Sequence, residues 1–358
     1  MTDLYLRPTA FIDAPFGHDG QAARLAGGLC WFSAVELIAR NGPRQLIPLD
    51  RLDDARATLP APQRDRFDQL WSNLTTARPP LALGQRTLRF DSPSVMGILN
   101  VTPDSFSDGG RHMDADIAAA AAVDMAAAGV AIVDVGAEST RPGAAPVWEG
   151  DELARLEPLL PRLAAAGLLV SVDTRKAAVM RQALALGAGV VNDVSALTYD
   201  PAALDLVAAA GCPVVLMHHR GDPQTMQDDP RYDDVLLDVF DGLEARIAAC
   251  VAAGIGRGRI IADPGIGFGK SLRHNLDLLN GLSLFHGLGV PLLLGASRKR
   301  FIGALSGEAP ADQRLGGSIA VAVAGIAQGV QIVRVHDVPE TVQALRVWRG
   351  LRDAALTP

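Results

Sequence analysis

Lysine is scarce in this chain. Of the 33 basic residues only three are lysine, at positions 176, 270 and 299, and arginine takes the other places. Nucleotide bias in the gene explains such a shift, and chance explains equally well why any one lysine remains. A lysine kept under that bias can also mark a position that needs a compact, flexible ammonium.

Aromatic residues and long apolar runs are also few. Aromatics make up 5% of the residues against 49% hydrophobic residues overall, so the core is built mainly from Ala, Leu, Val and Ile. This composition excludes disordered and collagen-like chains. Apolar runs such as 130–135 and 213–217 are far shorter than the roughly 20 residues that span a membrane. No secretory signal is visible at the start, and we expect no membrane partner.

Excess positive charge and paired cysteines are absent too. The net charge is −7, which argues against nucleic acid as a partner, because proteins that bind phosphate backbones are usually strongly basic. Cys30, Cys212 and Cys250 are odd in number, far apart and without metal-binding spacing. We therefore expect a reduced, cytoplasmic setting.

From about residue 94 onward, continuous apolar runs alternate with segments of helical period, as in parallel strands buried on both faces. The predicted strands are 94–100, 131–136, 168–173, 189–193, 213–218, 260–263, 291–295 and 331–336. The helices between them include 116–128, 176–186, 201–210, 232–253 and 314–328. Eight strands at about 32 residues per unit predict an α/β fold, a (β/α)8 TIM barrel spanning 91–358. A doubly wound sheet is the alternative.

Residues 1–90 form a small N-terminal extension of different character. Prolines and short polar stretches accompany a helix expected at 34–40, and two more at 53–57 and 64–72 are separated by Pro60 and Pro62. No chemical motif is present there, so a packing or dimer role is favoured over a second active site.

Every predicted barrel strand ends in unusual polar residues, and active sites of such barrels are built at those ends. One Asp or Asn after a strand is usually a turn or helix cap, but eight such ends are hard to explain as caps alone. Motifs for other chemistries fail: Pro264 replaces a glycine of the P-loop pattern, and Lys270 replaces the third glycine of the dinucleotide pattern. His218 and His219 lack zinc spacing, and we expect one of them against the barrel wall. No Ser-His-Asp or Cys-His nucleophile is evident.

The polar residues instead suit a flat heterocycle that carries phosphates. Asp173, Asn192 and Asp263 could bind an amino-pyrimidinone edge, whose adjacent N–H groups offer a carboxylate two parallel bonds. Lys299 could donate to a ring atom, while the planar guanidinium of Arg334 could stack on a ring and touch phosphate. Asn100, Thr140 and His336 could hold a diphosphate. Mg²⁺ could bind there with Asn100 as one of its oxygen ligands.

These residues lie in segments that closely resemble the dihydropteroate synthases of the pterin-binding TIM-barrel superfamily. The resemblance covers about 95–341. Its segments are 97–110 (Gly-Ile-Leu-Asn-Val-Thr-Pro-Asp-Ser-Phe-Ser-Asp-Gly-Gly), 138–144 (Glu-Ser-Thr-Arg-Pro-Gly-Ala), 171–174 (Ser-Val-Asp-Thr), 263–270 (Asp-Pro-Gly-Ile-Gly-Phe-Gly-Lys), 297–299 (Ser-Arg-Lys) and 334–338 (Arg-Val-His-Asp-Val). Together these motifs are highly specific.

The resemblance implies condensation of p-aminobenzoate with 6-hydroxymethyl-7,8-dihydropterin pyrophosphate, giving 7,8-dihydropteroate and pyrophosphate in folate biosynthesis. It implies a pterin site of Asp173, Asn192, Met217, Asp263, Phe268, Lys299 and Arg334. It implies Mg²⁺ and pyrophosphate at Asn100, Thr140, Arg334 and His336, with Asn100 as the metal ligand. The p-aminobenzoate site would comprise Phe106, Arg141, Pro142, Phe268 and Ser297. The catalytic residues would be Asp108, Thr140, Arg141, Lys299, Arg334 and His336.

Two departures from the family pattern affect local loop shape, namely Ala137 in place of a second glycine and His219-Arg220 where Met-Gln is common.

Two other functions are weighed: a methyltetrahydrofolate–corrinoid methyltransferase and a pterin-binding paralogue without turnover. Neither would need the intact stretches 100–110 and 140–143. The family is commonly dimeric through barrel helices, which favours a homodimer. Sulfonamides, as p-aminobenzoate mimics, should compete with p-aminobenzoate. The small residues of 318–329 could make a close helix contact, although core packing explains them equally well.

Overall fold

The computed structural model describes residues 3–84, 86–101, 111–138, 147–221, 226 and 228–357, with backbone alone for 111–114. Eight parallel strands form one sheet in the order β12-β11-β10-β9-β8-β7-β14-β13. A parallel bridge between Ala262 and Leu292 joins its two ends, and the Ala262 N–H donates to the Pro291 carbonyl at 2.9 Å. The sheet is therefore a closed barrel, as predicted.

All eight predicted strands are present, with slightly shorter bounds at most positions. They are β7 (Ser94–Asn100), β8 (Ile132–Gly136), β9 (Val170–Asp173), β10 (Val190–Asp193), β11 (Val214–Met217), β12 (Ile260–Asp263), β13 (Leu293–Leu294) and β14 (Ile332–Val335). Seven of them, all except β7, are buried at nearly every position because helices cover the outside and side chains fill the inside.

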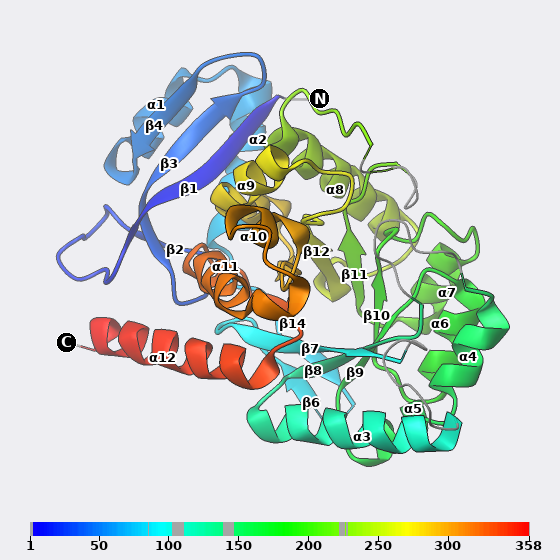
Figure 1. Cartoon of the computed structure of the whole chain (residues 1–358). Coiled ribbons are helices and arrows are strands. Elements are labelled where there is room, and N and C mark those ends of the chain that lie inside the picture. The colour runs from blue at the N-terminus through cyan, green and yellow to red at the C-terminus, as the bar shows by residue number, and fades with distance from the viewer. Residues whose placement is uncertain are drawn as a thin grey trace.

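Helices alternate with these strands around the barrel (Figure 1). They are α3 (Arg111–Ala128), α4 (Glu149–Leu156), α5 (Leu160–Ala165), α6 (Ala177–Ala185), α7 (Ala203–Ala210), α8 (Val235–Ala252), α9 (Leu272–Asn280), α10 (Arg300–Leu305), α11 (Leu315–Ala327) and α12 (Val338–Leu356). Short 3-10 helices lie at η3 (Arg257–Arg259), η4 (Leu282–Leu288) and η5 (Ala311–Gln313). In the part of the chain that is described, no helix has both the length and the apolar character needed to cross a membrane.

The extension contains an antiparallel sheet that the sequence analysis did not predict. The segment 34–40, expected to be a helix, lies in strand β3 (Trp31–Ala39), which pairs with β1 (Leu4–Ile12), β2 (Ala23–Arg24) and β4 (Arg44–Pro48). The helix prediction was wrong because Phe32, Val35 and Ile38 recur every three residues, which imitates a helical period. Pairing with a nine-residue partner strand overrides that local preference.

The other two helices predicted in the extension are confirmed. They are α1 (Leu52–Thr58), which follows η1 (Leu49–Arg51), and α2 (Ala61–Thr75). Pro62 lies within the first turn of α2, where its missing N–H costs nothing because that donor has no helical partner.

The extension packs on one side of the barrel, against α8 and η4 (blue in Figure 1). Its buried side chains, including Phe67, Leu70 and Leu74, belong to the same hydrophobic cluster as the barrel residues. Ion pairs join it to α8, since Arg40 contacts Asp238 and Asp241 at 2.7 Å and Arg66 contacts Glu244 at 2.6 Å.

The last part of the extension closes the N-terminal end of the barrel. The hairpin of β5 (Leu81–Leu83) and β6 (Arg86–Leu88) brings Leu81, Leu88 and Phe90 onto the innermost apolar side chains of the barrel strands. That end is thereby sealed with hydrocarbon, and the opposite end carries the polar side chains.

Candidate active site

The inward-facing side chains of the barrel change character within two residues. Side chains two apart on a strand face the same side. The inward positions near the N-terminal end are apolar, at Ile132, Val190, Val215, Ile261 and Ile332. Two residues further along the same strands they are Asp134, Asn192, Met217, Asp263 and Arg334. The sequence thus builds a polar layer directly on top of a hydrocarbon layer.

Arg334 and three neighbours form one hydrogen-bonded network in this layer. The Arg334 Nε donates to Asp134 Oδ2 at 2.6 Å, and its Nη2 donates to Asp173 Oδ2 at 2.7 Å. Asn192 Nδ2 donates to the same Asp134 oxygen at 3.0 Å. Burial raises the pKa of Asp173 to about 7, against the opposing effect of the Arg334 charge. A buried carboxyl with so strongly raised a pKa is typical of a functional site.

Several buried side-chain oxygens in and near this network have no hydrogen-bond partner among the described residues. They are Asp134 Oδ1, Asp173 Oδ1 and Ser171 Oγ. A buried acceptor without a donor is costly, so such atoms are found mainly where a ligand or ordered water supplies the missing bond. The pocket therefore offers its acceptors to a ligand that carries N–H groups.

Asp263 and Lys299 form the second half of the pocket. The Asp263 Oδ1 accepts from the Gly265 N–H at 2.7 Å, and burial raises the pKa of the carboxyl. Burial lowers the pKa of Lys299 to about 8 although Asp263 opposes the shift. The Lys299 ammonium donates to the Ile266 carbonyl and lies 4.5 Å from the centre of the Phe268 ring. These residues are brought together, as predicted.

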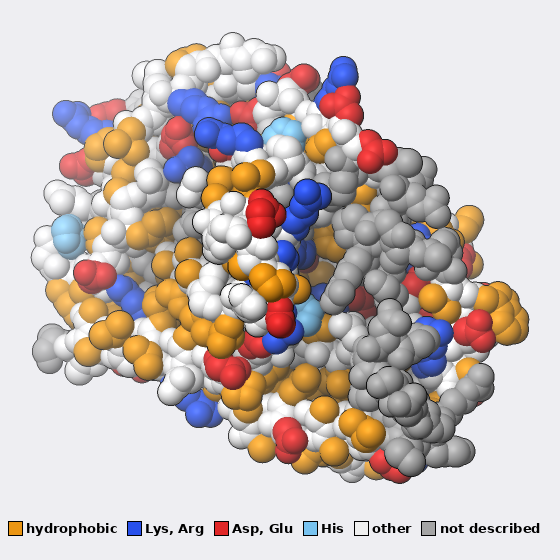
Figure 2. Space-filling model, viewed as in Figure 1, with side chains coloured by type: hydrophobic (Ala, Val, Ile, Leu, Met, Phe, Trp, Pro, Cys, Tyr) orange, Lys and Arg blue, Asp and Glu red, His pale blue; other side chains and the backbone are white. Residues whose placement is uncertain are grey.

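His336, Ser297 and Asn100 lie beside that pocket. Ser297 Oγ is 3.1 Å from His336 Nδ1 and accepts from the His336 N–H at 3.2 Å. A Cβ on Gly136 would lie 3.5 Å from Asn100 Oδ1 and 3.9 Å from Asp173 Oδ2, so glycine leaves space between them. Figure 2 shows basic side chains and a histidine gathered in a hollowed strip at the centre of the viewed face.

A strained residue separates Ser297 from Lys299. Arg298 has φ +58, which an L-residue rarely adopts, and Asp337 holds its guanidinium through an Nε bond of 3.0 Å. Its backbone N–H also donates to Ser318 Oγ at 2.8 Å. Such strain persists where the surroundings enforce it, and here it lies between two predicted site residues.

Sequence reasoning missed Asp134. It lies inside the run 130–135, which was treated as apolar, yet it is fully buried and contacts both Arg334 and Asn192. A carboxylate within a strand of valines and isoleucines was the signal, because an acidic residue there must have a partner. The predicted residues Phe106, Asp108, Thr140, Arg141 and Pro142 lie outside the described residues.

The other two lysines are more deeply buried than Lys299. Lys176 contacts Glu138 at 2.9 Å and Glu152 at 2.7 Å, so it forms a buried ion-pair cluster that spans two strand ends. Lys270 contacts His218, whose side chain is the histidine expected against the barrel wall. Burial lowers the pKa of His218 to about 2.

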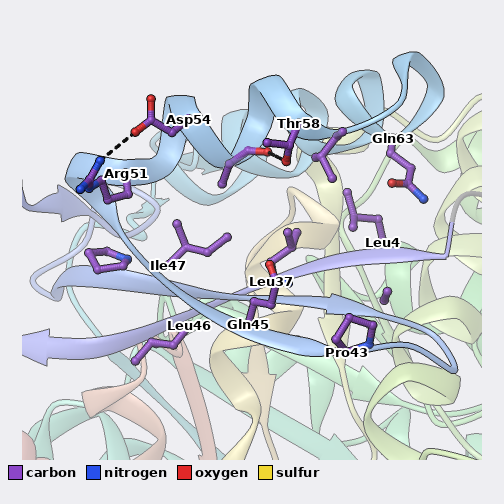
Figure 3. A pocket seen from close by; sticks show the side chains of 14 residues that line it. Leu4, Leu37, Pro43, Gln45, Leu46, Ile47, Arg51, Asp54, Thr58 and Gln63 are labelled. Atoms are coloured by element: carbon purple, nitrogen blue, oxygen red, sulfur yellow. Dashed lines mark hydrogen bonds and ion pairs between the residues drawn. The ribbon is translucent and has the colours of Figure 1, made fainter.

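A hollow of about 630 Å³ lies elsewhere, in the extension between β4 and α1 (Figure 3). Most of its polar lining side chains are exposed, including the Arg51–Asp54 ion pair, so water is not excluded from them. Within the described ranges no three His, Cys, Asp or Glu side chains converge to hold a metal. By contrast, Asp134, Asp173 and Asp263 of the barrel are buried.

Comparison with known proteins agrees with this geometry. A family profile described as pterin binding enzyme matches residues 96–336. Dihydropteroate synthase from Escherichia coli strain K12 is 49% identical over 262 residues, which is 73% of this chain and 92% of the relative. About a quarter of the chain lies outside that alignment, and the whole segment before residue 96 lies outside the family profile.

Solved structures have the same fold. Yersinia pestis dihydropteroate synthase, solved as a sulfonamide drug complex, has a TM-score of 0.73 at 47% identity and covers 77% of this chain and 100% of its own. The Xanthomonas albilineans enzyme with 4-aminobenzoic acid has a TM-score of 0.72 at 48% identity, covering 77% and 99%. With its closed barrel and its buried acidic and basic groups, the chain belongs to the dihydropteroate synthases of the pterin-binding enzyme family.

Proposed function

We propose that the chain joins p-aminobenzoate to the methylene carbon of 6-hydroxymethyl-7,8-dihydropterin pyrophosphate, and releases pyrophosphate. The observation that carries this proposal is the set of buried, partly unpartnered acceptors at the C-terminal end of the barrel. Asp173 and Asp263 stand on either side of Asn192 in the strand order and match the N–H groups of an amino-pyrimidinone ring.

The pterin lies in the polar layer. Asp173, Asn192 and Asp263 bind its edge, Lys299 donates to a ring atom, and Met217 and Arg334 contact its faces. The pKa of Lys299, lowered to about 8 by burial, leaves the ammonium charged at neutral pH. The guanidinium of Arg334 is already held by Asp134 and Asp173, so the face it presents to the ring is fixed before the substrate arrives.

Pyrophosphate departs on the side of Asn100, Thr140, Arg334 and His336. Loss of pyrophosphate leaves a cation delocalised into the pterin ring, so assistance consists mainly of positive charge at the leaving group. The guanidinium of Arg334 supplies such charge from the pocket wall, and His336 stands beside it on the same strand end.

Mg²⁺ fits this arrangement. The ion usually takes one or two protein oxygens and completes its shell with phosphate oxygens and water. Asn100 offers one amide oxygen beside the space at Gly136, which suits an ion that arrives with the substrate. When bound, Mg²⁺ would neutralise charge on the leaving pyrophosphate.

The amine of p-aminobenzoate is already a nucleophile, so orientation can replace a strong base. Phe268 lies against Lys299 and Ser297 against His336, and we assign both, with Phe106, Arg141 and Pro142, to the second substrate site. The family motifs add Asp108, Thr140 and Arg141 to the proposed catalytic set, although these three lie outside the described residues. The absence of an activated Ser or Cys motif from the sequence agrees with this chemistry.

The test is pyrophosphate release from the pterin pyrophosphate, measured with and without p-aminobenzoate. We expect product that depends on p-aminobenzoate, and sulfonamides should compete with it. Corrinoid-dependent demethylation would indicate the methyltransferase instead, and pterin binding without turnover would indicate the non-catalytic paralogue. Lys299→Ala should lose pterin affinity in calorimetry while it keeps the fold.

We also infer a homodimer. Exposed apolar side chains gather over α3, α11 and α12 (Figure 2), and include Ile117, Val123, Val347 and Leu351. Gly325 and Gly329 of the segment 318–329 face Leu294 and His286, so they serve internal packing. Charged substitutions at Val347 and Leu351 should give monomers in analytical ultracentrifugation. A wild-type chain that sediments as a monomer would contradict the inference.

A cytoplasmic location is part of the same proposal. Cys30, Cys212 and Cys250 are all buried and unpaired, which suits a reducing compartment. Fractionation of the source cells would test it, and recovery of the enzyme outside the cytoplasm would contradict it.

A further inference from the structure

Lys270 is a buried lysine without a role in the proposed chemistry. Its side chain is 3% exposed and lies between the ends of β11 and β12. The ammonium is 3.0 Å from the Phe268 carbonyl, 3.3 Å from the His218 carbonyl and 3.2 Å from His218 Nδ1. An ammonium has three N–H donors, and here each can be matched to an acceptor.

Neutral hydrogen-bond acceptors surround Lys270, and of the nearby charges Asp263 favours its ammonium form while Lys299 opposes it. Burial lowers the pKa of His218 to about 2, so its ring is neutral and Nδ1 can accept a hydrogen bond. Burial also lowers the pKa of Lys270 to about 7, although Asp263 opposes the shift. The Lys270 ammonium is therefore stabilised mainly by the two carbonyl groups and the neutral imidazole. These neutral acceptors stabilise the charge only while their geometry is kept.

The chain between Asp263 and Lys270 is shaped to present Phe268. Gly265, Gly267 and Gly269 all have positive φ, and a Cβ on Gly265 would lie 1.8 Å from the His218 carbonyl oxygen. From outside, Asn275 Oδ1 accepts from the Gly267 N–H at 2.7 Å, and the Tyr232 hydroxyl donates to the Gly269 carbonyl at 2.9 Å. From inside, Lys270 binds the carbonyl of Phe268 itself.

Phe268 in turn contacts the pterin lysine, because its ring centre is 4.5 Å from Lys299 Nζ. We propose that Lys270 is a positioning residue, which ties the Phe268 backbone to His218 of the neighbouring strand end and so aims the Phe268 ring at Lys299 and the p-aminobenzoate site. This role rests on the proposed function, since it assigns substrate contacts to Phe268.

The scarcity of lysine agrees with this role. A planar guanidinium is larger and directs its donors within one plane, so it cannot reach three acceptors arranged around a point. The chain has arginine at 30 of its 33 basic positions, and a lysine at position 270 fits this geometric requirement. The three acceptors around Lys270 thus suit an ammonium better than a guanidinium.

The test compares Lys270→Met with a matched control, Ser271→Ala. Ser271 caps α9 by accepting from the His274 N–H at 3.2 Å, and this bond does not involve Phe268. Its loss should therefore lower the melting temperature and leave both KM values within twofold. Lys270→Met should raise KM for p-aminobenzoate at least tenfold while kcat changes less than threefold, because binding of the second substrate is lost. A variant that is less stable but keeps its KM would overturn the proposal.

A double-mutant cycle separates positioning from general packing. If Lys270 acts through Phe268, then Lys270→Met should change KM less than twofold when Phe268 is already alanine. Independent, multiplicative effects would refute the proposal. Should Lys270→Met fail to fold, Lys270→Gln keeps an N–H donor on a shorter chain and should raise KM at least fivefold; an unchanged KM counts against the role.

One readout does not depend on turnover. A crystal structure of Lys270→Met, or of Lys270→Gln, should show the Phe268 ring displaced from Lys299. A ring still 4.5 Å from Nζ would exclude positioning by Lys270 even if the wild-type enzyme proves active. Conversely, suppose the ring is displaced in the variant and the wild-type enzyme makes no p-aminobenzoate-dependent product. That pair of results would contradict the proposed function and leave the positioning role intact.

Discussion

The two ends of this barrel are built from the same strands and have opposite properties. At the N-terminal end, Ile132, Val190 and Ile332 pack with Leu81 and Leu88 of the hairpin into a sealed apolar cluster. At the C-terminal end, polar side chains one step further along the same strands hold acceptors that have no partner among the described residues. The apolar end therefore stabilises the fold, whereas the polar end lowers the stability of the fold and provides groups that can bind a ligand.

The division has a physical basis. Each buried apolar side chain contributes about 1.5–3 kcal/mol by leaving water. A buried carboxylate costs free energy unless it is paired, and burial raises the pKa of both Asp173 and Asp263. Substitutions at the two ends should therefore have opposite effects on stability and on binding.

The largest effect is expected from removal of the extension. A chain that starts at residue 91 would lose the apolar hairpin and expose the barrel surface now covered by Phe67, Leu70 and Leu74. We expect no cooperative thermal transition by circular dichroism. As a control, Arg66→Met removes the ion pair with Glu244 and should cost about 1 kcal/mol. A truncated chain that melts cooperatively and turns over would show that the barrel is sealed without the hairpin.

A single substitution at the sealed end comes next. Leu88→Ala removes a side chain that is 4% exposed and should lower the free energy of unfolding by about 2–5 kcal/mol through cavity formation. Pterin affinity should stay within twofold, because the cavity lies one layer below the site. Denaturant unfolding and calorimetry measure the two quantities. A parallel loss of affinity would show that the two layers are coupled.

The corresponding change at the open end is Asp263→Asn, which is nearly isosteric. An amide nitrogen would face the N–H groups of the pterin, so affinity should fall at least 100-fold, equivalent to about 2.7 kcal/mol. The melting temperature should hold or rise, because a buried carboxylate whose pKa is raised is replaced by a neutral group. A lower melting temperature together with an unchanged pterin affinity would show that Asp263 stabilises the fold and does not bind the pterin.

The smallest effect concerns pH. Burial lowers the pKa of Lys299 to about 8, so the side chain is an ammonium below that pH and a neutral amine above it. Pterin affinity of the free enzyme should therefore fall about tenfold per unit above pH 8. Calorimetry between pH 7 and 9.5 measures the slope. In Lys299→Arg the affinity should be lower and the break near pH 8 should vanish; a break that persists must come from another group.

Much of the barrel could be predicted because its signal is local. Continuous apolar strands, helical periods between them and polar strand ends are all visible along the chain, and they located Asp173, Asn192, Asp263, Lys299 and Arg334. Asp134 was missed because its neighbours made the run look apolar. The segment 34–40 was misassigned because its apolar spacing fits a helix and its partner strand lies some thirty residues away.

Within the barrel, the amino-acid sequence was sufficient to predict the order of strands and helices, most of the polar site residues and the family motifs. Only the tertiary structure decided that Arg334 is held between Asp134 and Asp173, that Lys270 binds the carbonyl of Phe268, and that a hairpin of the extension seals the barrel. The reason is that composition and periodicity act along the chain, whereas hydrogen bonds and close packing join distant residues such as Asp134 and Arg334, which are 200 positions apart.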